Sequence, residues 1–195
     1  MDFSRPIATN PMEPGWYQYK FNRKQRSLHQ IRFTKKAGKN VAELKSDNSI
    51  ARLYREVDIP LEDYQTLSWD WMIETPIALK KVSEKLRDGD DHPARIHLSL
   101  ITENGEHREL ELIWGNELTK PEFFSVEGLP HYVVRGGSQT NQWFSEAVNV
   151  WELYKQLWPD DGTARITDIG ISADSDQTKQ KTLSFIANLK VIRKN

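Results

Sequence analysis

A chain of 195 residues with a formal net charge of -1 is long enough for one domain with a substantial core. The balanced charge, without a lysine-rich or arginine-rich face, argues against nucleic acid as the main partner. The absence of cysteine excludes disulfides, thiolate nucleophiles and cysteine-ligated metal sites.

The chain begins with an irregular, proline-containing lead-in over residues 1–15. Its first six residues lack the apolar core of a signal peptide, and no apolar run in the sequence approaches the roughly 20 residues that span a bilayer. We therefore expect no membrane span. The compartment stays open: cytoplasmic, or periplasmic or secreted if a leader has been removed.

Short strands are predicted over residues 16–21, 29–35, 40–45 and 49–57, with no helix between them, which is typical of an antiparallel all-β architecture. A further strand over 66–73 places Leu67, Trp69, Trp71 and Ile73 on one face and Asp70 on the other. Residues 78–87 form a charged connection with room for one or two helical turns.

An acidic turn around Asp90 and Asp91 then leads into a strand over 94–102. Alternate apolar residues from Ala94 to Leu100 face the core, while Arg95 and His97 occupy the polar face. Asparagine-glycine at 104–105 predicts a hairpin. The returning strand, 108–114, is expected to turn Leu110, Leu112 and Trp114 inward and Glu109, Glu111 and Ile113 outward.

Residues 115–130 are expected to form a long loop before a strand over 130–135. From Trp143 to Trp158 the apolar residues recur every three or four positions, which predicts an amphipathic helix over about 142–158, capped by Asn141. Strands over 164–173, with a bulge near Asp168, and over 181–193 complete the chain. About ten short strands and one packed helix indicate a single all-β domain, an antiparallel β-sandwich of jelly-roll type.

Several short motifs occur together in this order between Leu67 and Ile192. They are Trp69-Asp70-Trp71, the run from Asp90 to Ile96, Ile113-Trp114-Gly115, Trp143 with Glu146, Asn149, Val150 and Tyr154, and the turn from Asp174 to Thr178. In this combination the chain resembles the bacterial family known as domain of unknown function 3047. The family pattern has an arginine at the position of Val148 and an aspartate at that of Leu153. The closing strands also resemble those of galactose-binding-like jelly rolls, which implies sugar binding and a structural calcium.

A metal site is one interpretation of the two acidic turns. Calcium takes six to eight oxygen ligands, and Asp90, Asp91, Asp174 and Asp176 offer carboxylates in loops that also expose backbone carbonyls. The alternative is two solvated turns, or an ion pair between Asp91 and Arg95 that orders the entry to the strand. The spacing does not match a helix-loop-helix calcium loop.

For function, we expect a non-catalytic carbohydrate-binding-like module that takes an oligosaccharide or polysaccharide. The predicted ligand-binding residues combine polar groups with tryptophans that offer flat rings for stacking. They are Asp70, Arg95, His97, Glu111, Trp69, Trp71, Trp114 and Trp143. No catalytic residue is predicted. The alternatives are a glycoside-cleaving enzyme that uses two of the carboxylates Asp70, Glu109 and Glu111, or an interaction scaffold with an exposed apolar patch. The sequence does not indicate the oligomeric state.

Overall fold

The structure is a computed structural model and describes residues 1, 3–5, 7, 15–18 and 31–194. The predicted strands over 16–21 and 29–35 lie partly outside these residues, as does most of the predicted lead-in. The first strands are β1 (Tyr17–Gln18), β2 (Ile31–Lys36), β3 (Lys39–Asp47), β4 (Ile50–Pro60), β5 (Thr66–Thr75), β6 (Arg95–Thr102) and β7 (His107–Gly115). The chain continues with β8 (Glu122–Val126), β9 (Leu129–Gly136), β10 (Phe144–Asn149), α1 (Val150–Leu157), β11 (Ala164–Asp174) and β12 (Lys181–Ile192).

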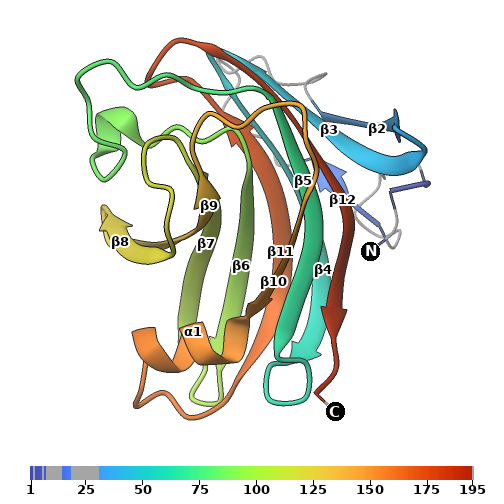
Figure 1. Ribbon diagram of the computed structural model, residues 1–195. Helices are drawn as coiled ribbons and strands as arrows, with labels where there is room; N and C mark the ends of the chain where they lie inside the picture. Colours follow the sequence, from blue (N-terminus) through green and yellow to red (C-terminus); the bar gives the residue numbers. More distant parts are fainter. Residues whose placement is uncertain (2, 6, 8–14, 19–30, 195) are drawn as a thin grey trace.

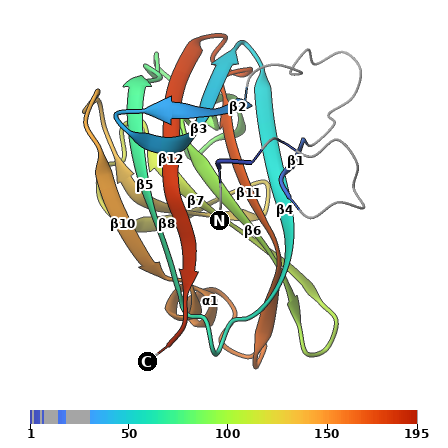
Figure 2. The same cartoon turned by 90° about the vertical axis from the view of Figure 1, so that its right-hand side faces the viewer.

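These strands form two sheets that pack face to face as a β-sandwich of jelly-roll type (Figures 1 and 2). One sheet has seven strands in the order β1-β4-β11-β6-β7-β9-β8, and the other has five in the order β10-β5-β12-β3-β2. All neighbouring strands are antiparallel except β7 and β9, which run parallel. The predicted fold class is confirmed. In the described part of the chain, no helix is long and apolar enough to cross a membrane.

The core lies between the sheets and is filled by alternate residues of their inner faces. Ile96, Leu98 and Leu100 of β6 meet Trp69 and Trp71 of β5 there. Four of the seven tryptophans are fully or almost fully enclosed, namely Trp16, Trp69, Trp71 and Trp114. The rings of Trp69, Trp71 and Trp114 meet edge to face, with centroids 5.2 and 5.5 Å apart, a geometry that aromatic quadrupoles favour.

The predicted helix over 142–158 is wrong in its first half. Residues 144–149 form β10, which pairs with β5 at the edge of the five-stranded sheet, and only Val150–Leu157 is helical. The helix is capped by Asn149, whose side chain accepts from the backbone N–H of Glu152 at 3.1 Å, and not by Asn141. Val148 belongs to the core and Phe144 packs against it. A spacing of four residues, which is compatible with a helix, here places both side chains on the inner face of a strand.

Two connections also differ from the prediction. The expected long loop over 115–130 contains β8, which pairs with β9. The connection over 78–87 forms no α-helix; a single 3-10 turn follows at Arg87–Gly89. The carboxylate of the buried Glu84 accepts hydrogen bonds from the backbone N–H groups of Asn116, Glu117 and Leu118 at 2.6 to 2.9 Å. This connection therefore fixes the chain that leaves β7.

β-Bulges in β11 and β12 change which face of the sheet the side chains beyond the bulge occupy. The predicted bulge near Asp168 is present, as a shift of register between Ile166 and Asp168. In β12 the register shifts again between Ala187 and Lys190, and Asn188 has a φ of 53°. As a result Phe185 packs on the outer face, whereas Leu189 points into the core, and the alternation of side chains along this strand is interrupted.

Candidate functional site

The candidate site lies on the outer face of the seven-stranded sheet, the face turned away from the other sheet. Strand register sets seven residues opposite one another in a row across this face. The row consists of Tyr17, Tyr54, Gly170, His97, Glu111, His131 and Phe124. Sequence neighbours of the row, such as Leu98 and Leu110, lie in the core, because side chains alternate along a strand. We call these seven residues the polar row.

Arg95 stands next to the polar row and joins three carboxylates. Its guanidinium lies 2.5 Å from Glu111 Oε2, 2.8 Å from Asp174 Oδ2 and 3.1 Å from Asp90 Oδ1. Burial opposes its charge, but the three carboxylates raise the pKa of Arg95 well above its ordinary value. A permanently charged guanidinium is the one side chain that can hold this many carboxylate oxygens in a fixed fork. Arg95 is therefore the centre of the network.

Glu111 is the anion at the middle of the polar row. Its Oε1 lies 2.7 Å from His97 Nδ1 and 3.5 Å from Arg52 Nη2, and its Oε2 lies 3.1 Å from His131 Nε2. Burial favours the neutral acid, but the charges and hydrogen bonds of His97, Arg95 and His131 hold the pKa of Glu111 well below its usual range. Glu111 is thus an ionised, nearly enclosed carboxylate.

The two histidines of the polar row differ in charge. Burial and the nearby Arg52 lower the pKa of His97 to about 4, so it is neutral at pH 7 and its Nε2 lies 2.6 Å from Ser172 Oγ. Burial also opposes the charge of His131, yet hydrogen bonds to Asp90 and Glu111 raise its pKa to about 9. Phe124 stacks on the His131 ring at 5.0 Å between centroids.

The two acidic turns meet at Arg95, although in a different way from either interpretation of the sequence. Asp174 is enclosed, and burial raises its pKa to about 7 despite the neighbouring Arg95. The imidazoles of His131 and His92, whose Nε2 atoms lie 3.3 and 3.4 Å from Asp90 Oδ1, lower the pKa of Asp90 against the effect of burial. The expected ion pair between Asp91 and Arg95 does not form. Asp91 turns away and accepts from the backbone N–H groups of Gln177 and Thr178, at 3.4 and 2.6 Å.

The predicted metal ligands do not converge on one point. Asp90 and Asp174 face Arg95, Asp91 faces backbone N–H groups, and Asp176 is only half-buried. Among the described residues, no group of three histidine or acidic side chains is arranged to hold a metal ion. In this arrangement the four carboxylates do not fit a calcium site, and calcium binding stays a prediction.

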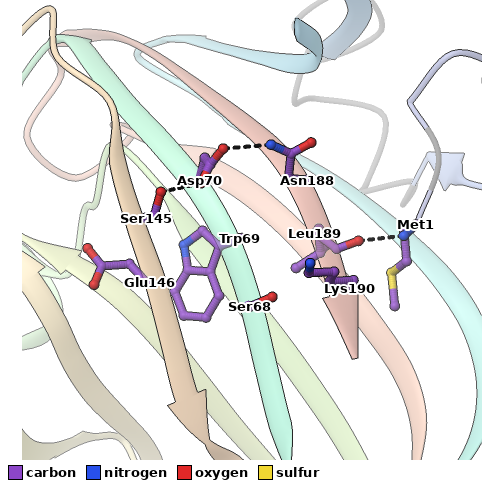
Figure 3. Close-up of a pocket in the computed structure, with 9 residues that line it drawn as sticks. All are labelled: Met1, Ser68, Trp69, Asp70, Ser145, Glu146, Asn188, Leu189 and Lys190. Atoms are coloured by element: carbon purple, nitrogen blue, oxygen red, sulfur yellow. Dashed lines mark hydrogen bonds between the residues drawn. The ribbon is translucent and has the colours of Figure 1, made fainter. Parts of the chain in front are cut away.

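Asp70, which we expected beside Arg95, lies on the opposite side of the molecule, because β5 belongs to the five-stranded sheet. Its carboxylate accepts from Lys39 Nζ, Ser145 Oγ and Asn188 Nδ2, each at 2.6 Å. Figure 3 shows Asp70, Ser145 and Asn188 at the rim of a shallow pocket of about 380 Å³. Trp143 is on this face too, with Lys39 Nζ 4.6 Å from its ring centre.

The tryptophans predicted to stack on a sugar are mostly out of reach of a ligand. Trp69, Trp71 and Trp114 are in the core, at most 1 % exposed. Their positions are fixed by packing and by indole hydrogen bonds: Trp71 donates to Glu146 at 3.1 Å and Trp114 to the carbonyl of Gly137 at 2.9 Å. Only Trp143 of the predicted four keeps part of its ring at the surface.

Of the predicted site residues, the structure brings together Arg95, His97, Glu111, Asp90 and Asp174. Sequence reasoning missed His131, Arg52 and Ser172. His131 could have been recognised from the sequence, because it lies in a predicted strand and its side chain is expected on the face opposite to that of Tyr132, just as His97 is expected opposite to Ile96. Nothing in the sequence indicated that β7 and β9 are neighbours, since a parallel pair has no hairpin to mark it.

Together, the fold and this network define a jelly-roll β-sandwich protein with a charged site on one sheet face. The chain belongs to the family described as "protein of unknown function (DUF3047)", whose model matches residues 14–190. The resemblance seen in the sequence is thereby confirmed. Among curated proteins none matches the chain.

Solved structures with a similar arrangement are β-sandwich proteins of low sequence identity. A family 12 xyloglucanase from Bacillus licheniformis in complex with ligand aligns with a TM-score of 0.48 and 8% identity over 97% of this chain and 91% of that one. The xyloglucanase domain of NopAA from Sinorhizobium fredii, in complex with cellobiose, gives 0.45 and 11% over 84% and 92%. A family 11 carbohydrate-binding module from Clostridium thermocellum gives 0.43 and 10% over 97% and 95%.

Proposed function

We propose that the protein is a non-catalytic carbohydrate-binding module whose ligand lies across the outer face of the seven-stranded sheet. The observation that carries this proposal is the polar row, a line of aromatic, imidazole and carboxylate groups that crosses all seven strands of the sheet at one level. Sugars present both hydroxyl donors and acceptors beside apolar ring faces. A row that mixes fixed donors, fixed acceptors and aromatic rings matches that chemistry.

The buried network supports binding because it fixes the groups nearer the surface. Arg52 keeps 28% of its side chain exposed, and Tyr54 is half-buried, while the Glu111 and Arg95 side chains beside them are only 3% and 4% exposed. A ligand that contacts Arg52, Tyr54 and the edge of His97 therefore meets side chains that are already held in place. Such preorganisation improves affinity by reducing the entropy lost on binding.

Glycoside cleavage is the second candidate, and one observation favours it. Glu111 and Asp174 lie on the same face, and their surroundings push their pKa values in opposite directions, as in an acid and base pair. Both carboxylates, however, contact the same guanidinium. A glycosidase needs its two carboxylates on either side of the scissile bond, and here Arg95 occupies the space between them.

An interaction scaffold has less support. Within the described residues, the exposed large apolar side chains are Leu86 and Ile192. They lie in the connection before β6 and at the end of β12. Neither forms part of a broad apolar patch of the kind that marks a partner surface.

The experiment compares one aromatic residue from each outer face. Wild type, Tyr54→Ala and Trp143→Ala are titrated calorimetrically against soluble β-glucans, xyloglucans, xylans and mannans, and reducing ends are assayed in the same mixtures. We expect a member of the panel to bind, Tyr54→Ala to weaken that binding by about tenfold or more, and Trp143→Ala to leave it unchanged.

Binding that depends on Trp143 but not on Tyr54 would move the site to the other sheet. A wild type that binds none of the polysaccharides contradicts the proposal. Release of reducing ends by the wild type, lost in Glu111→Gln, would replace the binding module with the glycosidase.

A further inference from the structure

A second feature of the outer face lies where the sheet ends beside α1. A cavity of about 470 Å³ is lined there by Trp158, Arg108, Glu109, Glu127, Leu129 and Pro130. Trp158 follows the last residue of α1 and is half-buried, in contrast to the enclosed tryptophans of the core. Figure 1 shows α1 across this end of the sandwich.

The ring of Trp158 is held in a fixed position. The backbone N–H of Trp158 donates to the carbonyl of Tyr154 at 2.8 Å, and the Trp158 ring centre lies 5.5 Å from that of Tyr154, which is fully buried. The guanidinium of Arg108 lies 5.9 Å from the Trp158 ring. Arg108 in turn is anchored by two contacts to Asp161, at 2.7 and 3.1 Å. A flat aromatic surface that is already ordered loses little entropy when a ligand stacks on it.

One wall of the cavity continues the face that carries the polar row. Glu109 precedes Glu111 by two residues on β7, and Leu129 precedes His131 by two residues on β9, so each pair shares the outer face. Arg108 alternates with Glu109 and pairs with Leu100 of the core, so Arg108 and the Trp158 ring beside it form the opposite wall, at the end of the sheet. Two residues along a strand span about 7 Å. A ligand that reaches from the polar row to Trp158 is therefore longer than a single sugar ring.

The charges of the cavity select against an acidic ligand. Glu109 and Glu127 present carboxylates, of which Glu127 is paired with Arg87 at 2.8 Å, and the positive charge of Arg108 is already paired with Asp161 and Glu106. The four carboxylates of this region thus outnumber its two guanidinium groups. Carboxylates accept hydrogen bonds from hydroxyl groups but repel the carboxylates of uronic acids.

From these observations we propose that Trp158 is the stacking platform of an outer subsite, which binds one ring of a neutral oligosaccharide whose remainder lies on the polar row. The inference rests on the proposed function and deepens it, because it specifies a chain of several neutral sugars as the ligand.

The test measures affinity against chain length. Wild type, Trp158→Ala and Trp151→Ala are titrated with the disaccharide, the hexasaccharide and a uronate-containing hexasaccharide of the polysaccharide that the wild type binds. Trp151 is the matched control: it also stacks near Tyr154 but does not line the cavity. We expect Trp158→Ala to weaken hexasaccharide binding by about tenfold, with disaccharide binding and the Trp151→Ala protein unchanged. The wild type should bind the uronate-containing chain more weakly than the neutral one.

Unchanged hexasaccharide binding by Trp158→Ala overturns the subsite, and so does an equal loss for both chain lengths. Either result leaves the proposed function standing, whereas a wild type that binds no carbohydrate removes both. If Trp158→Ala melts well below the wild type, Trp158→Leu retains apolar packing against Tyr154 without a flat ring and is expected to show the same chain-length effect.

Discussion

Each of the two outer faces of this sandwich carries a carboxylate on an interior strand of its sheet, but the two carboxylates differ in their burial and in their partners. Glu111 is enclosed among Arg95, Arg52 and two histidines, and Arg95, His97 and His131 each contact further charged or polar groups. Asp70 has three hydrogen-bond donors at the surface of the other sheet. Below that layer the second face is apolar, with Met72 and Phe185 in a small cluster of their own.

This difference shows that a polar residue on the outer face of a strand can either cover an apolar layer or form part of a buried polar layer. On the five-stranded sheet, Asp70 and its partners cover an apolar layer, and each contact can be lost separately. On the seven-stranded sheet, the polar side chains themselves fill the buried layer, so the loss of one leaves its partners unpaired. Buried polar networks therefore couple their members more strongly than surface ion pairs do.

The largest expected effect comes from removing the central cation on each face. Arg95→Met leaves the enclosed carboxylates of Glu111 and Asp174 and the half-buried carboxylate of Asp90 without their shared partner, and we expect it to lower the free energy of unfolding by about 3–5 kcal/mol. Lys39→Met makes the same kind of change at Asp70, but a third of the Lys39 side chain is exposed. We expect that change to cost less than about 1 kcal/mol. Urea unfolding at pH 7 measures both, and equal losses would show that the faces do not differ.

The next prediction separates the faces by pH. The pKa of His131 is raised to about 9 in the folded protein, so its stabilisation is complete below the unfolded pKa of about 6.5 and is lost as the pH rises to 9. We expect a loss of about 2 kcal/mol between pH 7 and 9. Asp174, with a folded pKa of about 7, is half ionised at pH 7 and almost fully ionised by about pH 8, so it contributes to the first part of this loss and the range from 8 to 9 is left to His131. His131→Gln should flatten the unfolding free energy there.

The opposite face responds to acid. Burial raises the pKa of Asp70, but hydrogen bonds from Lys39, Ser145 and Asn188 outweigh it and lower the pKa below the ordinary 3.8. Its contribution is therefore present above pH 3.8 and is lost as the pH falls further. Glu111 and Asp90 on the first face also have lowered pKa values and contribute to the same acid limb. Asp70→Asn should therefore remove only the contribution of Asp70 to the acid limb and leave the alkaline limb unchanged. If His131→Gln leaves the alkaline limb unaltered, the fall in stability at high pH is not due to His131.

A smaller effect is expected at Gly170, where the polar row contains no side chain. A Cβ added to Gly170 would lie 3.1 Å from His97 Cβ and 3.4 Å from its ring. We expect Gly170→Ala to displace His97 from Ser172, at a cost of about 1 kcal/mol in unfolding free energy, and to weaken carbohydrate binding. Ser172→Ala removes the same contact without crowding. If Gly170→Ala matches the wild type in both measurements, the position of His97 does not depend on the glycine.

Alternation was enough to predict most of the described strands, but not β8 or β10, together with the inner face of β6 and the bulge near Asp168. It also brought Arg95, His97 and Glu111 together, because the asparagine-glycine hairpin fixes β6 beside β7. Alternation does not say which sheet a strand joins, and for that reason Asp70 was placed with them. Nor does it say whether a polar face is covered. Ile113, expected outward, is fully buried because the outer face of β7 is itself enclosed at that level.

The mistaken helix has a similar physical cause. Trp143, Ala147, Val150 and Trp151 recur with helical spacing, but residues 144–149 add an edge strand to β5 by long-range pairing that no local pattern encodes. Within this stretch Asn149 is both the last residue of the strand and the N-cap of the helix. The change from the two-residue period of a strand to the 3.6-residue period of a helix therefore occurs at this one residue. The strand β8 was missed because Phe123 and Phe124 are consecutive and show no alternation.

The order of the strands has a consequence for how the chain reaches this structure. β11 lies between β4 and β6, and β12 lies between β5 and β3, so each sheet receives a central strand from the last thirty or so residues described. During synthesis from the N-terminus, both sheets are split into halves with unpaired edges until these strands leave the ribosome. Folding of the sandwich is therefore completed only after β12 has been translated. Until then, the exposed strand edges are where chaperones would be needed to prevent aggregation.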